Sequence, residues 1–186
     1  MGKVKAVRCP IDEVWLFEGA EYLDERGSFV RVLEPDVLAL AGMASDIRQV
    51  NLSLTRGLGS IRGIHAQQPP NAESKLVRCL EGSVFDVAVD LRRGSPTFLN
   101  WFGVELTASN HRQLLIPAGC GHGFQVLSSE ARLLYLHSGD YSPQNEFRVR
   151  FNDPSIDIDW PLSVGTVSAK DLEVALLSVS FRGIEL

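Results

Sequence analysis

The sequence predicts an all-β protein, a sandwich or barrel of short strands. Short apolar segments recur along the chain, and glycines and prolines separate them as turn residues. Alternation is clearest at 83–91, where Phe85, Val87 and Val89 share one strand face while Asp86 and Asp90 share the other. Only two short stretches have a helix-forming composition. Many short strands with closely spaced turns are typical of antiparallel sandwiches and barrels.

Nine strands and two helices are expected in chain order. The predicted strands are residues 49–54, 61–67, 75–80, 83–91, 97–106, 113–116, 123–127, 131–137 and 147–151. The predicted turns carry Gly57, Gly59, Pro69, Pro70, Gly82, Gly94, Pro96, Gly119 and Asn145. The predicted helices are residues 37–43, rich in Leu and Ala, and residues 168–177.

The bulk composition predicts one ordinary globular domain over residues 1–186. It is 45% hydrophobic and 22% charged, and no apolar run approaches the roughly 18 residues of a membrane span. The N-terminus lacks the apolar core of a secretory signal, and Cys9, Cys79 and Cys120 are an odd number without paired spacing. These features favour a cytoplasmic protein with reduced thiols.

The charge balance argues against nucleic-acid binding and leaves a small anionic ligand open. The net charge is −5, and no Lys/Arg cluster offers a concentrated basic face for phosphate backbones. A few arginines in a cleft can nevertheless hold a diphosphate against an acidic background.

A cluster of chemistry-bearing residues lies in the predicted strands. Arg62, Gly63 and His65 occupy one strand, Lys75 opens the next, and His122 follows a glycine-rich turn. A barrel can direct such side chains into one cavity, where a histidine can act as a general base and the cations can hold an anion. The cluster therefore predicts a site for an anionic substrate.

Strand parity sorts the polar side chains. Gln49, Asn51 and Ser53 share one face of their strand, which predicts either a hydrogen-bonding wall or an exposed amphipathic strand. His65 has the opposite parity to Arg62, so both reach one site only if the strand bulges between them. Gly63 is the residue that permits a bulge.

Three residues have both a structural and a functional interpretation. His65 is either a satisfied structural histidine or a general base. Lys75 is either a solvated strand end or a buried cation that holds an enolate or phosphate oxygen. Tyr135 is either a core tyrosine or a phenol that donates a proton.

The spacing around His122 resembles the second characteristic segment of the cupin superfamily. Metal-binding cupins also need a paired His-x-His, and the first segment here has only His65, so no metal site is expected. Cys120 is predicted to be a small buried residue rather than a nucleophile, because the sequence around it contains no recognisable oxyanion-hole motif.

Many short motifs together resemble one enzyme family. They are residues 24–29 (DERGSF), 49–51 (QVN), 61–65 (IRGIH), 75–77 (KLV), 82–87 (GSVFDV), 90–92 (DLR), 94–98 (GSPTF), 117–124 (PAGCGHGF), Tyr135, 141–143 (YSP), 153–154 (DP), 159–161 (DWP) and 168–171 (SAKD). In this order, over about residues 10–175, they are similar to the dTDP-4-dehydrorhamnose 3,5-epimerase family.

The resemblance implies a fold, an assembly and an activity. It implies a cupin-type jelly-roll β-barrel with a few short helices and no metal or organic cofactor. It also implies a homodimer in which an N-terminal segment reaches the partner's site. The implied substrate is a nucleoside-diphosphate 4-keto-6-deoxy sugar, with inversion at C3 and C5 of dTDP-4-dehydro-6-deoxy-D-glucose through an enolate.

The resemblance also implies residue roles. His65 is the base, Asp171 orients it, Tyr135 is the opposing acid, and Lys75 stabilises the enolate. The implied substrate contacts are Arg26, Phe29, Arg31, Gln49, Val50, Asn51, Arg62, Lys75, His122, Tyr141, Glu146 and Lys170. Of these, Tyr141 would stack on the nucleobase, with Glu146 and Lys170 nearby.

Departures from the family pattern leave alternatives open. Arg31 stands where a glutamate is usual, so it either changes the choice of nucleotide or pairs with Glu34 on the surface. Ala66 replaces a usual aromatic residue, and Cys120 stands where a larger apolar residue is common. The rivals are a single-position epimerase, an enzyme for CDP- or GDP-linked sugars, a non-catalytic sugar-nucleotide-binding cupin, and a metal-dependent cupin enzyme.

Overall fold

Strands dominate the chain in the computed structural model, which describes residues 3–40 and 47–186. The strands are β1 (Lys5–Arg8), β2 (Trp15–Glu18), β3 (Ala20–Asp24), β4 (Gly27–Arg31), β5 (Gln49–Arg56), β6 (Ile61–Gln67), β7 (Lys75–Glu81), β8 (Ser83–Asp90), β9 (Trp101–Thr107), β10 (Arg112–Ile116), β11 (Cys120–Val126), β12 (Glu130–His137) and β13 (Glu146–Arg148). The described helices are α1 (Pro35–Leu40) and α2 (Ala169–Leu172).

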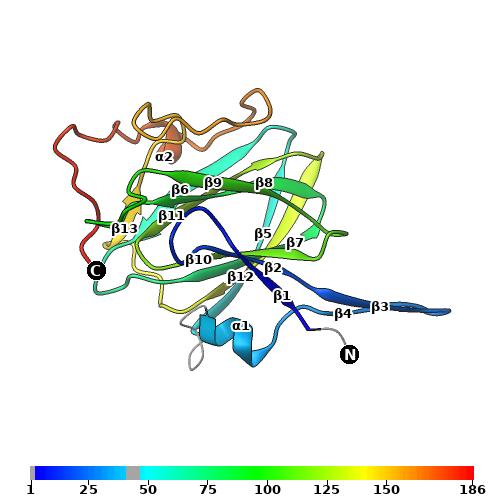
Figure 1. Cartoon of the computed structure of the whole chain (residues 1–186). Coiled ribbons are helices and arrows are strands. Elements are labelled where there is room, and N and C mark those ends of the chain that lie inside the picture. The colour runs from blue at the N-terminus through cyan, green and yellow to red at the C-terminus, as the bar shows by residue number, and fades with distance from the viewer. Residues whose placement is uncertain (1–2, 41–46) are drawn as a thin grey trace.

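Two large sheets face each other and form the body of the molecule. The six-stranded sheet has the order β1-β2-β10-β7-β12-β5, and the five-stranded sheet has the order β13-β6-β11-β8-β9. Figure 1 shows these two layers, with the short α2 above β6. The expected all-β class is confirmed, and the two sheets are the walls of a cupin-type jelly roll.

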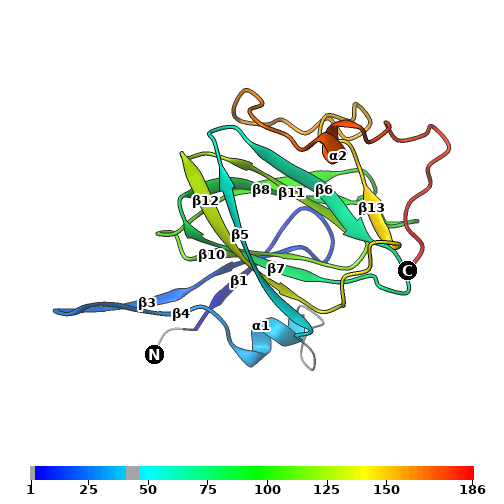
Figure 2. The same ribbon diagram turned by 180° about the vertical axis from the view of Figure 1, so that it is seen from behind.

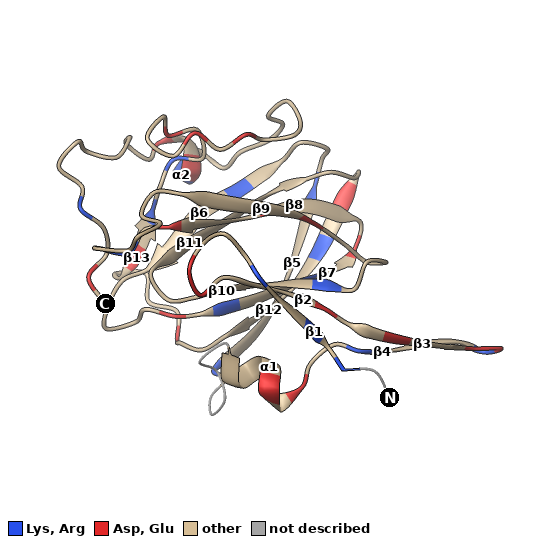
Figure 3. Cartoon of the chain, viewed as in Figure 1, with Lys and Arg blue, Asp and Glu red and all other residues tan. Residues whose placement is uncertain are grey.

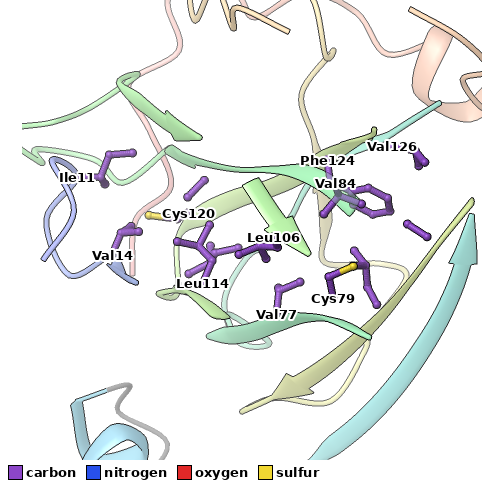
Figure 4. Close-up of a cluster of buried hydrophobic side chains, with 14 residues drawn as sticks. Ile11, Val14, Val77, Cys79, Val84, Leu106, Leu114, Cys120, Phe124 and Val126 are labelled. Carbon is purple, nitrogen blue, oxygen red and sulfur yellow. The ribbon is translucent and has the colours of Figure 1, made fainter. Parts of the chain in front are cut away.

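The space between the sheets is filled by apolar side chains (Figure 4). Val77 and Leu114 come from the six-stranded sheet, while Val84, Leu106 and Phe124 come from the five-stranded sheet. All of them are 2% exposed or less. Inward-facing residues of both sheets therefore build one core, as the alternation in β8 predicts.

The β3–β4 hairpin stands apart from this body. It forms its own two-stranded sheet, and Figure 1 and the reverse view in Figure 2 both show it projecting away from the two layers. Acidic and basic segments are interspersed along the ribbon (Figure 3). Among the described residues, none of the helices has the length and apolar character needed to cross a membrane.

All nine predicted strands are present, and three of them have an end shifted by three residues or more. The strand predicted at 97–106 begins only at Trp101, because the hydroxyls of Ser95 and Thr97 donate to the buried Asp90 and hold that segment as a turn. The strand predicted at 147–151 ends at Arg148, and Arg150 already accepts from Asp153 in the next turn.

The third shifted strand, predicted at 123–127, begins earlier, at Cys120. Its glycines indicate a turn in the sequence, but Cys120 to Gly123 pair with β8 instead. A Cβ atom on Gly121 or Gly123 would lie 2.4 or 2.5 Å from the Ile64 side chain. The glycines therefore serve close packing within a strand rather than a turn.

The sequence prediction missed the first four strands, β1 to β4, and misjudged both helices. β1 is exposed along its whole length and the hairpin has no buried residue, so neither has the one-sided apolar pattern of a packed strand. The helix predicted at 37–43 is α1, Pro35–Leu40, and residues 41–43 lie outside the described residues. The helix predicted at 168–177 ends at Leu172, and the Leu177 amide donates to Asp153 instead.

Candidate active site

A pocket of about 250 Å³ lies between the two sheets. Its lining residues come from β5, β6, β7, β11 and β12: Asn51, Leu52, Ser53, Arg62, His65, Lys75, His122, Phe124, Tyr135 and His137. A neighbouring cavity of about 410 Å³ shares Arg62 and His65 with it and also contains Lys170 and Asp171. We call the first cavity the central pocket and the second the side cavity.

A bulge in β6 brings Arg62 and His65 to the same pocket. His65 pairs with His122 of β11 and Arg62 pairs with Phe124, so three steps on β6 match two steps on β11. Gly63 supplies the extra residue with φ +114°, and a Cβ atom there would lie 2.5 Å from the Gly123 Cα atom. The predicted bulge at Gly63 is therefore confirmed.

His65 and Asp171 form a hydrogen-bonded pair at the pocket. The His65 Nε2 atom lies 2.7 Å from Asp171 Oδ1, which joins β6 to α2 across more than a hundred residues of chain. The carboxylate accepts the Nε2 proton, so the Nδ1 atom keeps the lone pair. His65 therefore has the arrangement of an oriented general base.

Asp171 is held as an ionised acceptor. Arg148 Nη1 donates to its Oδ1 atom at 2.6 Å, and the Ser168 hydroxyl donates to Oδ2 at 2.9 Å. Burial on its own would raise the pKa of Asp171, but the hydrogen bonds from His65 and Ser168 and the charges of His65 and Arg148 leave that pKa below its usual value. The orienting carboxylate thus stays charged in neutral solution.

Tyr135 reaches the central pocket from the other sheet. It lies on β12 of the six-stranded sheet, whereas His65 lies on β6 of the five-stranded sheet. Its hydroxyl lies 3.3 Å from Ser53 Oγ, and burial raises the pKa of the phenol well above its ordinary value. Tyr135 therefore remains protonated in neutral solution and is able to donate a proton.

Lys75 is a buried cation and not a solvated strand end. Lys75 is only 9% exposed. Its Nζ atom donates a hydrogen bond to the His65 carbonyl at 3.3 Å and lies 3.6 Å from Glu73 Oε1. Burial lowers the pKa of Lys75, and the neighbouring carboxylate of Glu73 opposes that shift. The ammonium group faces the same pocket as His65 and Tyr135.

His122 belongs to a second histidine–carboxylate pair. Its Nε2 atom lies 2.8 Å from Oδ1 of the fully buried Asp86, and its ring meets the Tyr135 ring edge-on with centroids 5.9 Å apart.

In the described part of the chain, three or more His, Cys, Asp or Glu side chains do not gather anywhere as a metal-ligand set. Burial raises the pKa of Cys120 to about 12, which fits a structural thiol.

The polar wall of β5 is partly formed as predicted. Asn51 and Ser53 line the central pocket, and Gln49 accepts a hydrogen bond from the Tyr141 amide at 3.3 Å. Val50 and Leu52, however, are 60% and 61% exposed. Because β5 is the edge of its sheet, its apolar residues have no covering layer in the single chain.

The single chain does not bring the hairpin residues to the pocket. Arg26 and Phe29 line a shallow cavity of the hairpin itself, and Arg26 pairs with Asp24 at 2.6 Å. Arg31 Nη1 lies 3.2 Å from Glu34 Oε1, so the predicted pairing with Glu34 is confirmed. Glu146 pairs with Arg148 at 2.9 Å and is not among the residues that line the central pocket.

Sequence reasoning missed three contributors to the site: Arg148, Glu73 and His137. Arg148 pairs with His65 in the β13–β6 ladder and contacts Asp171. His137 follows Tyr135 by two positions, so strand parity could have placed it on the same face. Nothing in the sequence marks Glu73, which precedes β7 in a loop.

A histidine–carboxylate pair and a tyrosine phenol reach one pocket from facing sheets, with a buried lysine beside them, and these are the groups that an epimerase working by proton transfer needs. A model of the family described as dTDP-4-dehydrorhamnose 3,5-epimerase matches residues 8–178. The chain therefore belongs to the dTDP-4-dehydrorhamnose 3,5-epimerase family, and it is an isomerase.

Individual relatives agree with this membership. The dTDP-4-dehydrorhamnose 3,5-epimerase of Pseudomonas aeruginosa is 46% identical over 86% of this chain and 87% of that protein. The dTDP-4-dehydrorhamnose 3-epimerase of Streptomyces niveus is 41% identical over 90% of this chain and 81% of that protein. A solved dTDP-6-deoxy-D-glucose-3,5-epimerase of Legionella pneumophila, in complex with dTDP-4-keto-L-rhamnose, superposes with a TM-score of 0.88 at 40% identity, covering 96% and 95% of the two chains.

Proposed function

We propose that this chain converts dTDP-4-dehydro-6-deoxy-D-glucose to dTDP-4-dehydro-L-rhamnose by inverting C3 and C5. The observation that carries the proposal is the placement of His65 and Tyr135 on opposite walls of one pocket. Inversion of a carbon needs a base on one face and an acid on the other, and these two residues supply both. The dTDP-sugar complex of the Legionella relative supports the choice of substrate.

The first step removes a proton next to the C4 carbonyl. The C–H electrons move into the ring to form an enolate, and the proton passes to the Nδ1 atom of His65. Asp171, at 2.7 Å from Nε2, stabilises the imidazolium that results. Lys75 is the buried cation that stabilises the enolate oxygen.

The second step returns a proton to the opposite face. The enolate electrons form the new C–H bond with the proton of the Tyr135 hydroxyl, and exchange with water then resets the acid and the base. Each transfer by a positioned group contributes typically about 10²–10⁴-fold. These two proton transfers take place at C3 and again at C5, and neither changes the oxidation state of the sugar.

The remaining polar residues are assigned to substrate binding. Arg62, His122 and Asn51 face the sugar in the central pocket. Gln49, at the start of β5 and in contact with the Tyr141 amide, is assigned to the same substrate. Lys170 lies in the side cavity next to Asp171. Tyr141, which is 56% exposed, is assigned to stack on the nucleobase, and Glu146 and Val50 are assigned to the same substrate.

The active form is a homodimer whose hairpins are exchanged. Leu23 and Phe29 on the hairpin are 77% and 64% exposed, and Val50 and Leu52 on the edge strand β5 are 60% and 61% exposed. A second copy that covers these surfaces brings Arg26, Phe29 and Arg31 of one subunit to the pocket of the other. This accounts for binding residues that lie outside the pocket in the single chain.

Proton exchange in deuterated water tests the function directly. His65→Asn should abolish deuterium incorporation at C3 and C5 of the dTDP substrate, as measured by NMR. The circular-dichroism spectrum of the variant should still show the β structure of the natural chain. Retained exchange in the variant would refute His65 as the base. Absence of exchange in the natural chain, together with tight dTDP-sugar binding, would instead identify a non-catalytic cupin.

A second candidate is an epimerase that inverts one position only. The 3-epimerase of Streptomyces niveus is nearly as similar to this chain as the 3,5-epimerases are. The same NMR experiment separates the two candidates, because a single-position enzyme labels only C3 or only C5 in its product. Turnover of CDP- and GDP-linked 4-keto sugars beside the dTDP sugar tests whether Arg31, besides pairing with Glu34, changes the choice of nucleotide.

A further inference from the structure

Glu73 and His137 form a charged cluster with Lys75 at one end of the central pocket. Glu73 Oε1 lies 3.6 Å from Lys75 Nζ, and Glu73 Oε2 lies 3.0 Å from His137 Nδ1. The Glu73 side chain is only 4% exposed, so water does not screen these contacts. The proposed chemistry uses Lys75 and leaves the other two residues without a role.

The strand pairing explains why one carboxylate reaches both partners. Lys75 on β7 and His137 on β12 are directly paired in the six-stranded sheet. Glu73 lies two residues before Lys75, the first residue of β7, and its two oxygens bridge the ends of adjacent strands. The His137 ring also stacks on the Tyr135 ring with centroids 5.9 Å apart, which links the cluster to the proposed acid.

A buried lysine needs such a partner to stay charged. Burial favours the neutral amine and lowers the pKa of Lys75. Against this, Glu73 gives the largest favourable contribution, through its charge and its contact, and the charge of Glu146 on β13 adds to it. On the β6 side, Lys75 meets only the backbone carbonyl of His65, which cannot supply a negative charge.

We propose that Glu73 is a positioning residue that keeps Lys75 charged and directed at the pocket, with His137 holding Glu73 from the neighbouring strand. The inference rests on the proposed role of Lys75 at the enolate oxygen. A neutral amine would leave the developing oxyanion without its counter-charge, so Glu73 acts on the reaction through Lys75.

Glu73→Gln tests this inference, since the amide oxygen still accepts from His137 while the charge is lost. We expect kcat to fall about 10–100-fold at neutral pH with KM changed less than threefold, because the cation matters most when the enolate forms. Without Glu73 the pKa of Lys75 falls further, so the alkaline limb of the kcat profile should move about one pH unit or more toward lower pH. Activity should therefore recover in mildly acidic buffer.

Three companion variants keep the test decisive. Glu73→Asp should restore most of the alkaline limb. Glu81→Gln, at the exposed far end of β7, should leave the whole profile unchanged. Lys75→Gln should lose activity at every pH. If Lys75→Gln retains turnover, the proposed role of Lys75 is wrong.

The inference about Glu73 alone fails under two other results. One is loss of activity in Lys75→Gln with an unshifted profile in Glu73→Gln. The other is an equal loss at all pH values in Glu73→Gln together with a lowered melting temperature, which would mark Glu73 as purely structural.

Discussion

The two-sheet body and the β3–β4 hairpin follow different physical rules. In the body, residues such as Val77 and Leu114 are fully buried and fix the strands that carry the pocket. In the hairpin, Leu23 and Phe29 are 77% and 64% exposed. A lone two-stranded hairpin is at best marginally stable in water, so this one needs a covering surface.

The charged side chains of the body and of the hairpin also differ in burial. Asp171, Glu73 and Asp86 in the body are buried, and each is paired with a histidine. On the hairpin the fully exposed Asp24 has its pKa lowered by the hydrogen bond from Arg26. Buried pairs fix the geometry of a catalytic group, whereas an exposed pair is easily exchanged for another partner. The body thus holds its buried charges in fixed pairs, as the proposed proton transfer requires, whereas the charges of the hairpin are exposed.

Asp171→Asn should give the largest effect in the body. The amide no longer stabilises an imidazolium and no longer fixes the tautomer with the lone pair on Nδ1, so kcat should fall roughly 10³–10⁴-fold. Deuterium exchange at C5 measures this loss. A decrease below about tenfold would show that His65 does not depend on its orienting carboxylate.

Truncating a leucine to alanine should lower the free energy of unfolding far more in the body than on the hairpin. Leu114→Ala removes a fully buried side chain and should lower the free energy of unfolding by about 2–5 kcal/mol. Leu23→Ala on the exposed hairpin should change it by less than about 0.5 kcal/mol when the chains are dilute enough to be separate. Urea denaturation measures both variants, and equal losses would mean that the hairpin packs as firmly as the body.

Mixing an impaired hairpin variant with an inactive pocket variant should reveal whether the hairpin serves a partner's pocket. Arg26→Ala should lose about 10–100-fold in kcat/KM, as expected for a charged contact with a diphosphate. Mixed in equal amounts with His65→Asn and allowed to exchange subunits, it should recover about 25% of full activity, because one site of each mixed dimer is intact. No recovery, despite proven mixed dimers, would place the hairpin on its own subunit's site.

The smallest effect is expected at an exposed ion pair of the body. Arg132 and Glu81 lie 3.1 Å apart on the surface of the six-stranded sheet. Arg132→Ala should change the free energy of unfolding by less than about 1 kcal/mol and leave turnover unchanged. A larger loss would mean that exposed charges help to hold the sheet that carries Tyr135.

Much of the body was predictable because its strands alternate within short stretches. Short apolar stretches between turn residues located all nine strands of the prediction, with the clearest alternation at 83–91, and proton transfer was one of the two interpretations of His65 and Tyr135. The hairpin and β1 escaped because they lack a buried face in the single chain and so carry no alternating signal. The strand β2 also escaped, since it is only four residues long and has one buried residue, Phe17.

The sequence by itself determined the all-β class, the family and the residue types that carry the chemistry, because these depend on local patterns and ordered motifs. Only the tertiary structure decided which of those residues meet. The bulge at Gly63 turns Arg62 to the side of His65, and Arg148 and Glu73 join the site through strands and loops distant in sequence. Cross-strand register and buried charge pairing depend on packing between separate segments, and no local pattern encodes them.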